Sequence, residues 1–145
     1  MPDESTTPDL EEAFRRALEA FNRGDIDAAV SIWAPDAVYH LAAGGFAVVE
    51  GDSVTEPGSI RKLWEGLTAS FDAAEFDSEE FIDLGGGVTF SVVAMRGKPR
   101  GGSSFVEIRF GFVSSWRDGR IARARNYTDV EEARAAAERL AKERR

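Results

Sequence analysis

Residues 105–127 read FVEIRFGFVSSWRDGRIARARNY and predict two long strands joined by a tight turn. The dipeptide Asp118-Gly119 lies between two runs that alternate like strands, which is a strong signal for a short hairpin. Upstream, residues 79–84 and 88–96 have the same character and are separated by three consecutive glycines. We therefore expect the second half of the chain to form a series of antiparallel strands.

The first half of the chain has helical periodicity instead, and this periodicity returns near the C-terminus. Apolar residues recur three or four positions apart in four segments, so each segment predicts an amphipathic helix. Asp129 followed by Glu132 is a capping box that opens the last of them. The four apolar stripes are Leu10, Phe14, Ala17, Leu18 and Phe21; Val30 and Trp33, before Pro35; Ile60, Leu63, Trp64, Leu67 and Phe71; and Val130, Ala133, Ala137 and Leu140.

Between the second and third helices the pattern changes to that of strands. Residues 37–41 predict one strand and 46–50 its partner, followed by a loop over 51–58. Helices come first and strands follow without alternating with them, which indicates an α+β fold with helices packed on one face of a curved sheet. We expect residues 1–7 to be a disordered lead-in and residues 8–145 to form a single domain.

The composition excludes several classes of function. The 145 residues contain no cysteine and one histidine, so thiol chemistry is absent and a transition-metal site would have too few ligands. The formal net charge of −8 disfavours nucleic acid as a partner. No run approaches the roughly 18 apolar residues that cross a bilayer, and no secretory signal is visible. We expect a cytoplasmic protein that uses no metal and no cofactor.

The segments FNRGDIDAAVSIWAPDAVYH (21–40) and RDGRIARARNYTD (117–129), together with the order of the elements, resemble the SnoaL-like branch of the NTF2-like superfamily. The resemblance covers about residues 8–140. It implies a cystatin-like cone, in which a strongly bent antiparallel sheet wraps around helices and encloses an apolar pocket, with a helix at the C-terminus. Similar proteins include polyketide cyclases, ketosteroid isomerases, epoxide hydrolases and proteins without a known reaction, so the fold alone does not choose the activity.

Three activities of this family depend on acids, and this chain has an acid at only one of the corresponding positions. The carboxylate base of a ketosteroid isomerase would correspond to Leu41, which cannot accept a proton. An acid of the epoxide hydrolases would correspond to Asn126. The acid of a cyclase would correspond to Asp129, whose place at the start of a helix already explains it as a cap. The first two mechanisms therefore lack an acid that they need, and for Asp129 the role of helix cap is favoured over that of a proton donor.

Five residues remain as candidates for the site. His40 has the ordinary pKa for proton transfer near neutral pH, and Asn126 can donate and accept hydrogen bonds, so these two are the candidate catalytic groups. Tyr39, Trp33, Trp64 and Asn126 are the candidate ligand-binding residues. Strand alternation places Ala122, Ala124 and Asn126 toward the pocket and Ile121, Arg123, Arg125 and Tyr127 toward solvent.

Both faces of residues 88–96 are apolar, which predicts a cover on each side of the sheet: helices inside the cone and a second subunit outside. We therefore expect a homodimer that pairs through the sheet. Two functions stay open. One is a cofactor-free isomerase, cyclase or hydrolase acting on a small hydrophobic, carbonyl-bearing substrate. The other is a non-catalytic module that binds a small hydrophobic molecule or only dimerises.

Overall fold

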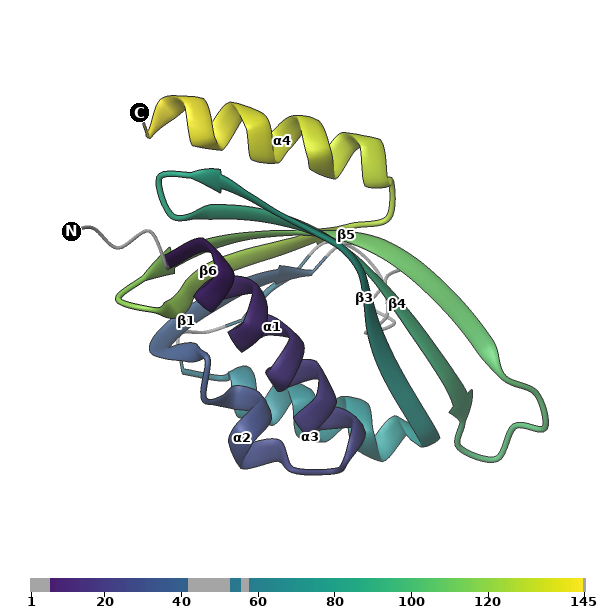
Figure 1. Ribbon diagram of the computed structural model, residues 1–145. Coiled ribbons are helices and arrows are strands. Elements are labelled where there is room, and N and C mark those ends of the chain that lie inside the picture. Colours follow the sequence, from purple (N-terminus) through teal and green to yellow (C-terminus); the bar gives the residue numbers. More distant parts are fainter. Residues whose placement is uncertain (1–5, 42–52, 56–57, 145) are drawn as a thin grey trace.

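Six strands form one curved sheet that has helices on both sides (Figure 1). The computed structural model describes residues 6–41, 53–55 and 58–144. The strand order is β2-β1-β6-β5-β4-β3, and every neighbouring pair is antiparallel except β1 and β6, which run parallel. The elements are α1 (Thr6–Asn22), α2 (Ile26–Val30), β1 (Trp33–Leu41), β2 (Ser53–Val54), α3 (Ile60–Ser70), β3 (Phe71–Gly85), β4 (Val88–Pro99), β5 (Val106–Arg117), β6 (Arg120–Tyr127) and α4 (Val130–Glu143).

The inner side of the sheet faces α1, α2 and α3, and α4 crosses the outer side (Figure 1). Each side has its own apolar core, because alternate residues of β4 and β5 point in opposite directions. The larger core joins the first three helices to inward residues such as Val93, Phe110 and Phe112. The smaller core joins Val88, Phe90, Val92 and Val113 to buried alanines of α4. The expected α+β cone with a C-terminal helix is confirmed.

The C-terminal helix lies very close to the sheet. Asp129 caps its first turn by accepting hydrogen bonds from the backbone N–H groups of Glu131 and Glu132, at 3.0 and 3.2 Å. Its buried face carries only alanines, at 133, 137 and 141. Opposite this face, a Cβ added to Gly111 of β5 would lie 2.3 Å from the Cβ of Ala133. Small residues on both elements therefore set this short separation.

A bulge in β6 changes which residues face inward. Arg123 pairs with Ser115, whereas Ile121 pairs with Trp116, so Ala122 is an extra residue in β6. As a result Ile121 is fully buried in the inner core and Ala122 is partly exposed. The alternation expected for this strand was therefore wrong for these two residues, and correct for Ala124 and Asn126, which are buried.

Three other expected boundaries differ in the structure. Trp33 was expected on a helix, but α2 ends at Val30 and Trp33 begins β1, because the carbonyl of Ile32 accepts a hydrogen bond from the backbone of Ile121 at 2.6 Å. Phe71 begins β3 in an extended conformation instead of continuing α3. The expected loop 51–58 contains the short strand β2, which pairs with His40 and Leu41.

Two expectations fall on parts of the chain that the structure does not describe. The strand expected over 46–50 lies outside the described residues, as do residues 1–5 of the expected lead-in, while α1 already begins at Thr6. Within the described residues, no helix is long and apolar enough to cross a bilayer. The same residues contain no cluster of three or more acidic or histidine side chains that could hold a metal ion.

Candidate functional site: an aromatic cavity inside the cone

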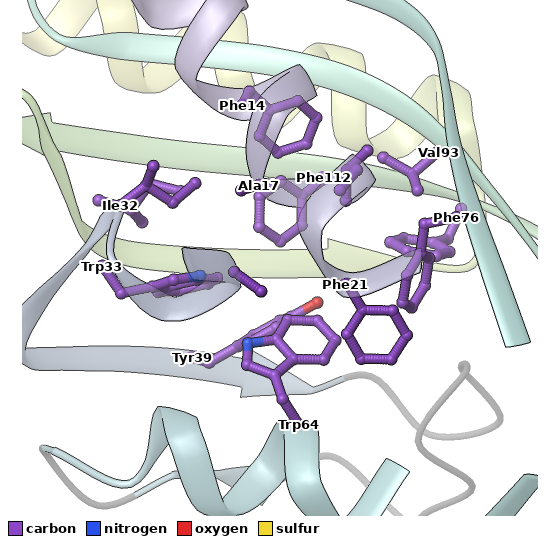
Figure 2. Close-up of a pocket in the computed structure, with 14 residues that line it drawn as sticks. Phe14, Ala17, Phe21, Ile32, Trp33, Tyr39, Trp64, Phe76, Val93 and Phe112 are labelled. Atoms are coloured by element: carbon purple, nitrogen blue, oxygen red, sulfur yellow. The ribbon is translucent and has the colours of Figure 1, made fainter. Parts of the chain in front are cut away.

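A small cavity lies between α1, α3 and the inner face of the sheet (Figure 2). Its volume is about 40 Å³, which holds a few water molecules and is far below the roughly 300–1,000 Å³ of most small-molecule sites. Its wall is almost entirely apolar, and its polar side-chain groups are the phenol of Tyr39 and the indole N–H groups of Trp33 and Trp64. The lining residues are Phe14, Ala17, Leu18, Phe21, Ala29, Ile32, Trp33, Tyr39, Trp64, Phe76, Val93, Phe110, Phe112 and Ile121.

Aromatic rings pack around Tyr39 on three sides. The ring of Trp33 stacks on Tyr39 with centroids 5.4 Å apart, and Phe112 meets it edge-on at 5.6 Å. Trp64, from α3, lies 6.3 Å from Tyr39 and 6.4 Å from Trp33. Offset and edge-to-face arrangements of this kind each stabilise the packing by roughly 0.5–1.5 kcal/mol beyond the burial of area. The cavity is thus held in shape by ring contacts between β1, β5 and α3.

A side-chain amide fixes the far wall of the cavity. The Asn22 Nδ2 donates to the carbonyl of Phe76 at 2.9 Å, and the backbone N–H of Phe76 donates to Asn22 Oδ1 at 2.8 Å. Asn22 is the last residue of α1, so this pair of bonds joins the end of the helix to β3. The adjacent Phe21 ring contacts the Phe76 ring with centroids 5.0 Å apart.

Tyr39 brings a hydroxyl group into the lining of the cavity. Its side chain is fully buried, and its phenol oxygen lies among the rings (Figure 2). The backbone N–H of Tyr39 donates to Thr55 Oγ1 at 3.0 Å, which ties β1 to the residue after β2. Burial raises the pKa of Tyr39 well above its ordinary value of 10.0, because desolvation disfavours the phenolate. The group therefore stays a neutral hydrogen-bond donor at physiological pH.

The structure separates His40 from this cavity. Neighbouring residues of a strand point to opposite faces, so Tyr39 faces inward and His40 lies on the outer side, in a groove between the sheet and α4. Its Nε2 lies 3.4 Å from Nη1 of Arg123. Burial, and then the charges of Arg123 and Arg125, lower the pKa of His40 from 6.5. His40 is therefore not placed together with the other candidates.

Asn126 lies on the same face of the sheet as the cavity but does not line it. It is buried on the inner face of β6, where it pairs in register with Phe112, but it is not part of the cavity lining. Trp33, Trp64 and Tyr39 all line the cavity, so the structure brings together three of the five candidates. In the described part of the chain, no carboxylate and no imidazole lines it.

Sequence reasoning missed several lining residues as candidates, although a signal was present for most of them. Phe14, Phe21, Phe110 and Phe112 stand on apolar stripes that indicate a core, and nothing in the stripe itself distinguishes a cavity wall from solid packing. Ile121 carried no usable signal, because the bulge at Ala122 reverses the alternation on which its orientation was judged.

The family model of the SnoaL-like domain matches residues 14–124, which include the cavity wall and the sheet up to β6. The chain belongs to the SnoaL-like domain family. The resemblance of the two sequence segments is thereby confirmed. No curated protein matches this SnoaL-like chain in sequence.

Solved structures similar to this SnoaL-like protein share its fold at low identity. TerC, co-crystallised with polyporic acid, has a TM-score of 0.68 at 18% identity, covering 90% of this chain and 98% of its own. IdmH, a putative polyketide cyclase from Streptomyces antibioticus, has a TM-score of 0.66 at 22% identity, covering 88% and 96%. A protein with a ketosteroid isomerase-like fold from Catenulispora acidiphila, in complex with trimethylamine, has a TM-score of 0.66 at 14% identity, covering 83% and 85%. At these identities the likeness shows the fold alone.

Proposed function

We propose that this protein binds a small, apolar, carbonyl-bearing molecule in the aromatic cavity, with the Tyr39 phenol donating a hydrogen bond to the carbonyl oxygen. The observation that carries the proposal is a fully buried, neutral phenol hydroxyl in a wall that otherwise consists of aliphatic side chains, phenylalanine rings and two indoles. A ligand that fills such a wall gains from apolar burial and is oriented by a single donor. The fold neighbour TerC, crystallised with polyporic acid, is consistent with ligand binding in this architecture.

Entry of a ligand requires one ring to move, because about 40 Å³ does not hold an aromatic molecule. Trp64 is suited to this role, since it is the aromatic residue of the lining that is partly exposed. It also comes from α3, whereas Trp33, Tyr39 and Phe112 are fixed within strands of the sheet. A change of Trp64 rotamer would enlarge the cavity toward the surface without disturbing the sheet.

A proton-transfer enzyme is the second candidate, and the state of Tyr39 favours it. A neutral phenol in an apolar site is the type of donor that stabilises a developing oxyanion. One fold neighbour, IdmH, is described as a putative polyketide cyclase. An isomerase or cyclase also needs a base, and the described lining contains no carboxylate or imidazole. Binding without catalysis is therefore the better supported of the two functions.

The test compares two ligands of nearly equal shape, acetophenone and ethylbenzene, of which only the first has a carbonyl. Titration followed by calorimetry and tryptophan fluorescence should show that the protein binds acetophenone more tightly. Tyr39→Phe removes only the hydroxyl. Since one neutral hydrogen bond contributes about 0.5–1.5 kcal/mol, this variant should lose about three- to tenfold in acetophenone affinity and keep its ethylbenzene affinity.

A matched pair of substitutions on α1 tests the location. Ala17 lines the cavity and Ala13, one turn earlier on the same helix, does not. Ala17→Leu should abolish binding of both ligands, whereas Ala13→Leu should leave it unchanged, provided that circular dichroism shows both variants folded. Undiminished binding in Ala17→Leu would mean that the ligand is bound elsewhere and would overturn the proposal.

A further inference from the structure

A second, larger depression lies on the opposite side of the sheet from the aromatic cavity. It runs between the outer face of β1, β5 and β6 and the second half of α4, and its volume is about 310 Å³. This volume lies at the lower end of the range found for small-molecule sites. We call it the outer groove. His40 and Arg125, which pair in register on the parallel strands β1 and β6, both lie in its wall.

The outer groove collects positive charge in a chain whose net charge is −8. Arg123 and Arg125 enter it from β6, and Arg139 enters it from α4. Glu143 is the one carboxylate residue of its lining in the described part of the chain. Charges of one sign that gather in a concave surface concentrate an ion of the opposite sign.

Two of these arginines are available to a ligand. Many arginines elsewhere on the surface form ion pairs, as Arg109 does with Glu79 at 2.6 Å and Arg117 with Asp36 at 3.1 Å. Among the described residues, neither Arg123 nor Arg139 has a carboxylate within ion-pair distance. Arg123 instead approaches the ring nitrogen of His40, at 3.4 Å.

The state of His40 is consistent with a positive potential in the groove. Burial lowers its pKa first, and the charges of Arg123 and Arg125 lower it further. A neutral imidazole can accept a hydrogen bond from the Arg123 guanidinium, which would hold the guanidinium against the wall of the groove. The positive charge of the groove at neutral pH therefore comes from its three arginines and not from His40.

The rest of the groove lining is partly apolar and partly polar. Val113 of β5 and Leu140 of α4 supply apolar surface, and Ser115 supplies a hydroxyl. We propose that the outer groove is a binding site for a small organic oxyanion, a carboxylate or a phosphate monoester, whose anionic group pairs with Arg123 and Arg139 and whose apolar part lies against Val113 and Leu140. Guanidinium groups match such oxyanions geometrically because they donate two parallel hydrogen bonds.

Anion binding in the outer groove can be measured directly at His40. His40 is the only histidine, so its imidazole protons give a single set of resonances in a proton NMR titration. Benzoate and phenyl phosphate are the probes, and benzyl alcohol is the uncharged control, all at constant ionic strength. Saturating benzoate or phenyl phosphate should raise the pKa of His40, because a bound anion offsets the charges of Arg123 and Arg125. Benzyl alcohol should leave it unchanged.

Charge-matched variants separate a defined site from general attraction. Arg123→Gln and Arg139→Gln should each weaken anion binding about tenfold or more, since each removes a charge-assisted hydrogen-bond donor. Arg120→Gln removes the same charge from the start of the same strand, outside the groove, and should change the affinity less than twofold. Glu143→Gln should strengthen binding, because it removes the negative charge from the lining.

Three results would overturn the proposal: a His40 resonance that neither anion moves, equal losses in Arg120→Gln and Arg123→Gln, or equal shifts with benzyl alcohol. If one anion binds at least tenfold more tightly than the other, the ligand class narrows to carboxylates or phosphates. The Ala17→Leu variant, which fills the inner cavity, should bind these anions like the wild type. This variant therefore tests the proposed anion site separately from the proposed ligand site in the aromatic cavity.

Discussion

Tyr39 and His40 are neighbours in the chain with opposite surroundings. Tyr39 is enclosed by rings and is kept neutral by desolvation. His40 lies on the other face of the same strand beside two guanidinium groups. Burial disfavours the ionised form of each side chain, the phenolate of Tyr39 and the imidazolium of His40, and the charges of Arg123 and Arg125 add to this effect for His40 alone. One strand therefore presents two uncharged polar groups to two separate depressions.

The pKa of His40 predicts how stability changes with pH. The folded-state pKa lies below the unfolded value of about 6.5, so the unfolded chain binds a proton more readily than the folded chain. The free energy of unfolding should therefore decrease as the pH falls from 7.5 to 5.5, a window above the titration of ordinary carboxylates. Urea unfolding at both pH values should show a smaller difference in His40→Asn than in the wild type. A wild-type protein that becomes more stable on acidification would contradict this assignment.

At the scale of elements, the contact between α4 and β5 depends on the absence of a side chain at Gly111. The alanines of the helix approach the strand so closely that a methyl group has no room. This contact is what allows α4 to cover Phe90 and Val113 on the outer face. The separation of helix and sheet is therefore set by two small residues and not by large interlocking side chains.

Two glycine substitutions test this contact. Gly111→Ala should destabilise the protein by about 1–3 kcal/mol, since the new Cβ would lie 2.3 Å from that of Ala133 and α4 would have to move outward. Gly66→Ala, in the exposed interior of α3 with no atom within 4 Å of its new Cβ, should stabilise it by roughly 0.5–1 kcal/mol. Denaturant titrations of the two variants measure both effects. If Gly111→Ala left the free energy of unfolding unchanged, α4 would be free to shift away from β5.

The sequence predicted the elements well where their periodicity was long and regular. The capping of α4 by Asp129 and the hairpin at Asp118-Gly119 were recognisable because both rest on local backbone chemistry. The orientation of Ile121 and the strand position of Trp33 were not, because a bulge and a contact between Ile32 and Ile121 decide them. Such features depend on pairing between distant segments, which no local pattern records.

The candidate site was predictable only in part for the same reason. Tyr39, Trp33 and Trp64 share a cavity, as the sequence suggested, because they stand on apolar faces of their elements. The outer groove and the place of His40 in it follow from the parallel pairing of β1 with β6 and from the position of α4. The spacing of residues along the chain predicts neither the pairing of β1 with β6 nor the position of α4.

At the scale of the whole molecule, α4 supplies the outer cover that the apolar faces of β4 led us to expect from a second subunit. The homodimer stays a prediction, and we propose that it uses the part of the sheet beyond α4. Phe105 and Val106 are the exposed large hydrophobic residues of the described chain, at 49% and 41%. The Arg96 guanidinium lies 4.2 Å from the centre of the Phe105 ring.

Sedimentation velocity at micromolar concentrations tests this pairing. The wild type should sediment as a dimer, and the double variant Phe105→Ser, Val106→Thr should shift toward the monomer, because it removes exposed apolar area from the interface. Ser103→Thr, in the preceding loop, should leave the distribution unchanged. A monomeric wild type, or a dimer that the double variant leaves intact, would contradict pairing through this end of the sheet.

The parallel pairing of the first long strand with the last has a consequence for how the chain reaches its native state. Tyr39 of β1 pairs with Ala124 of β6, and these two residues are far apart along the chain. The other neighbour of β1 in the sheet is the two-residue strand β2. Contacts so distant along the chain close late, after hairpins such as β3–β4 and β5–β6 have formed locally. We therefore expect β1 to pair with β6 only after β6 has been synthesised and has left the ribosome. On this expectation, the aromatic interior closes late in folding, when β1 joins the sheet.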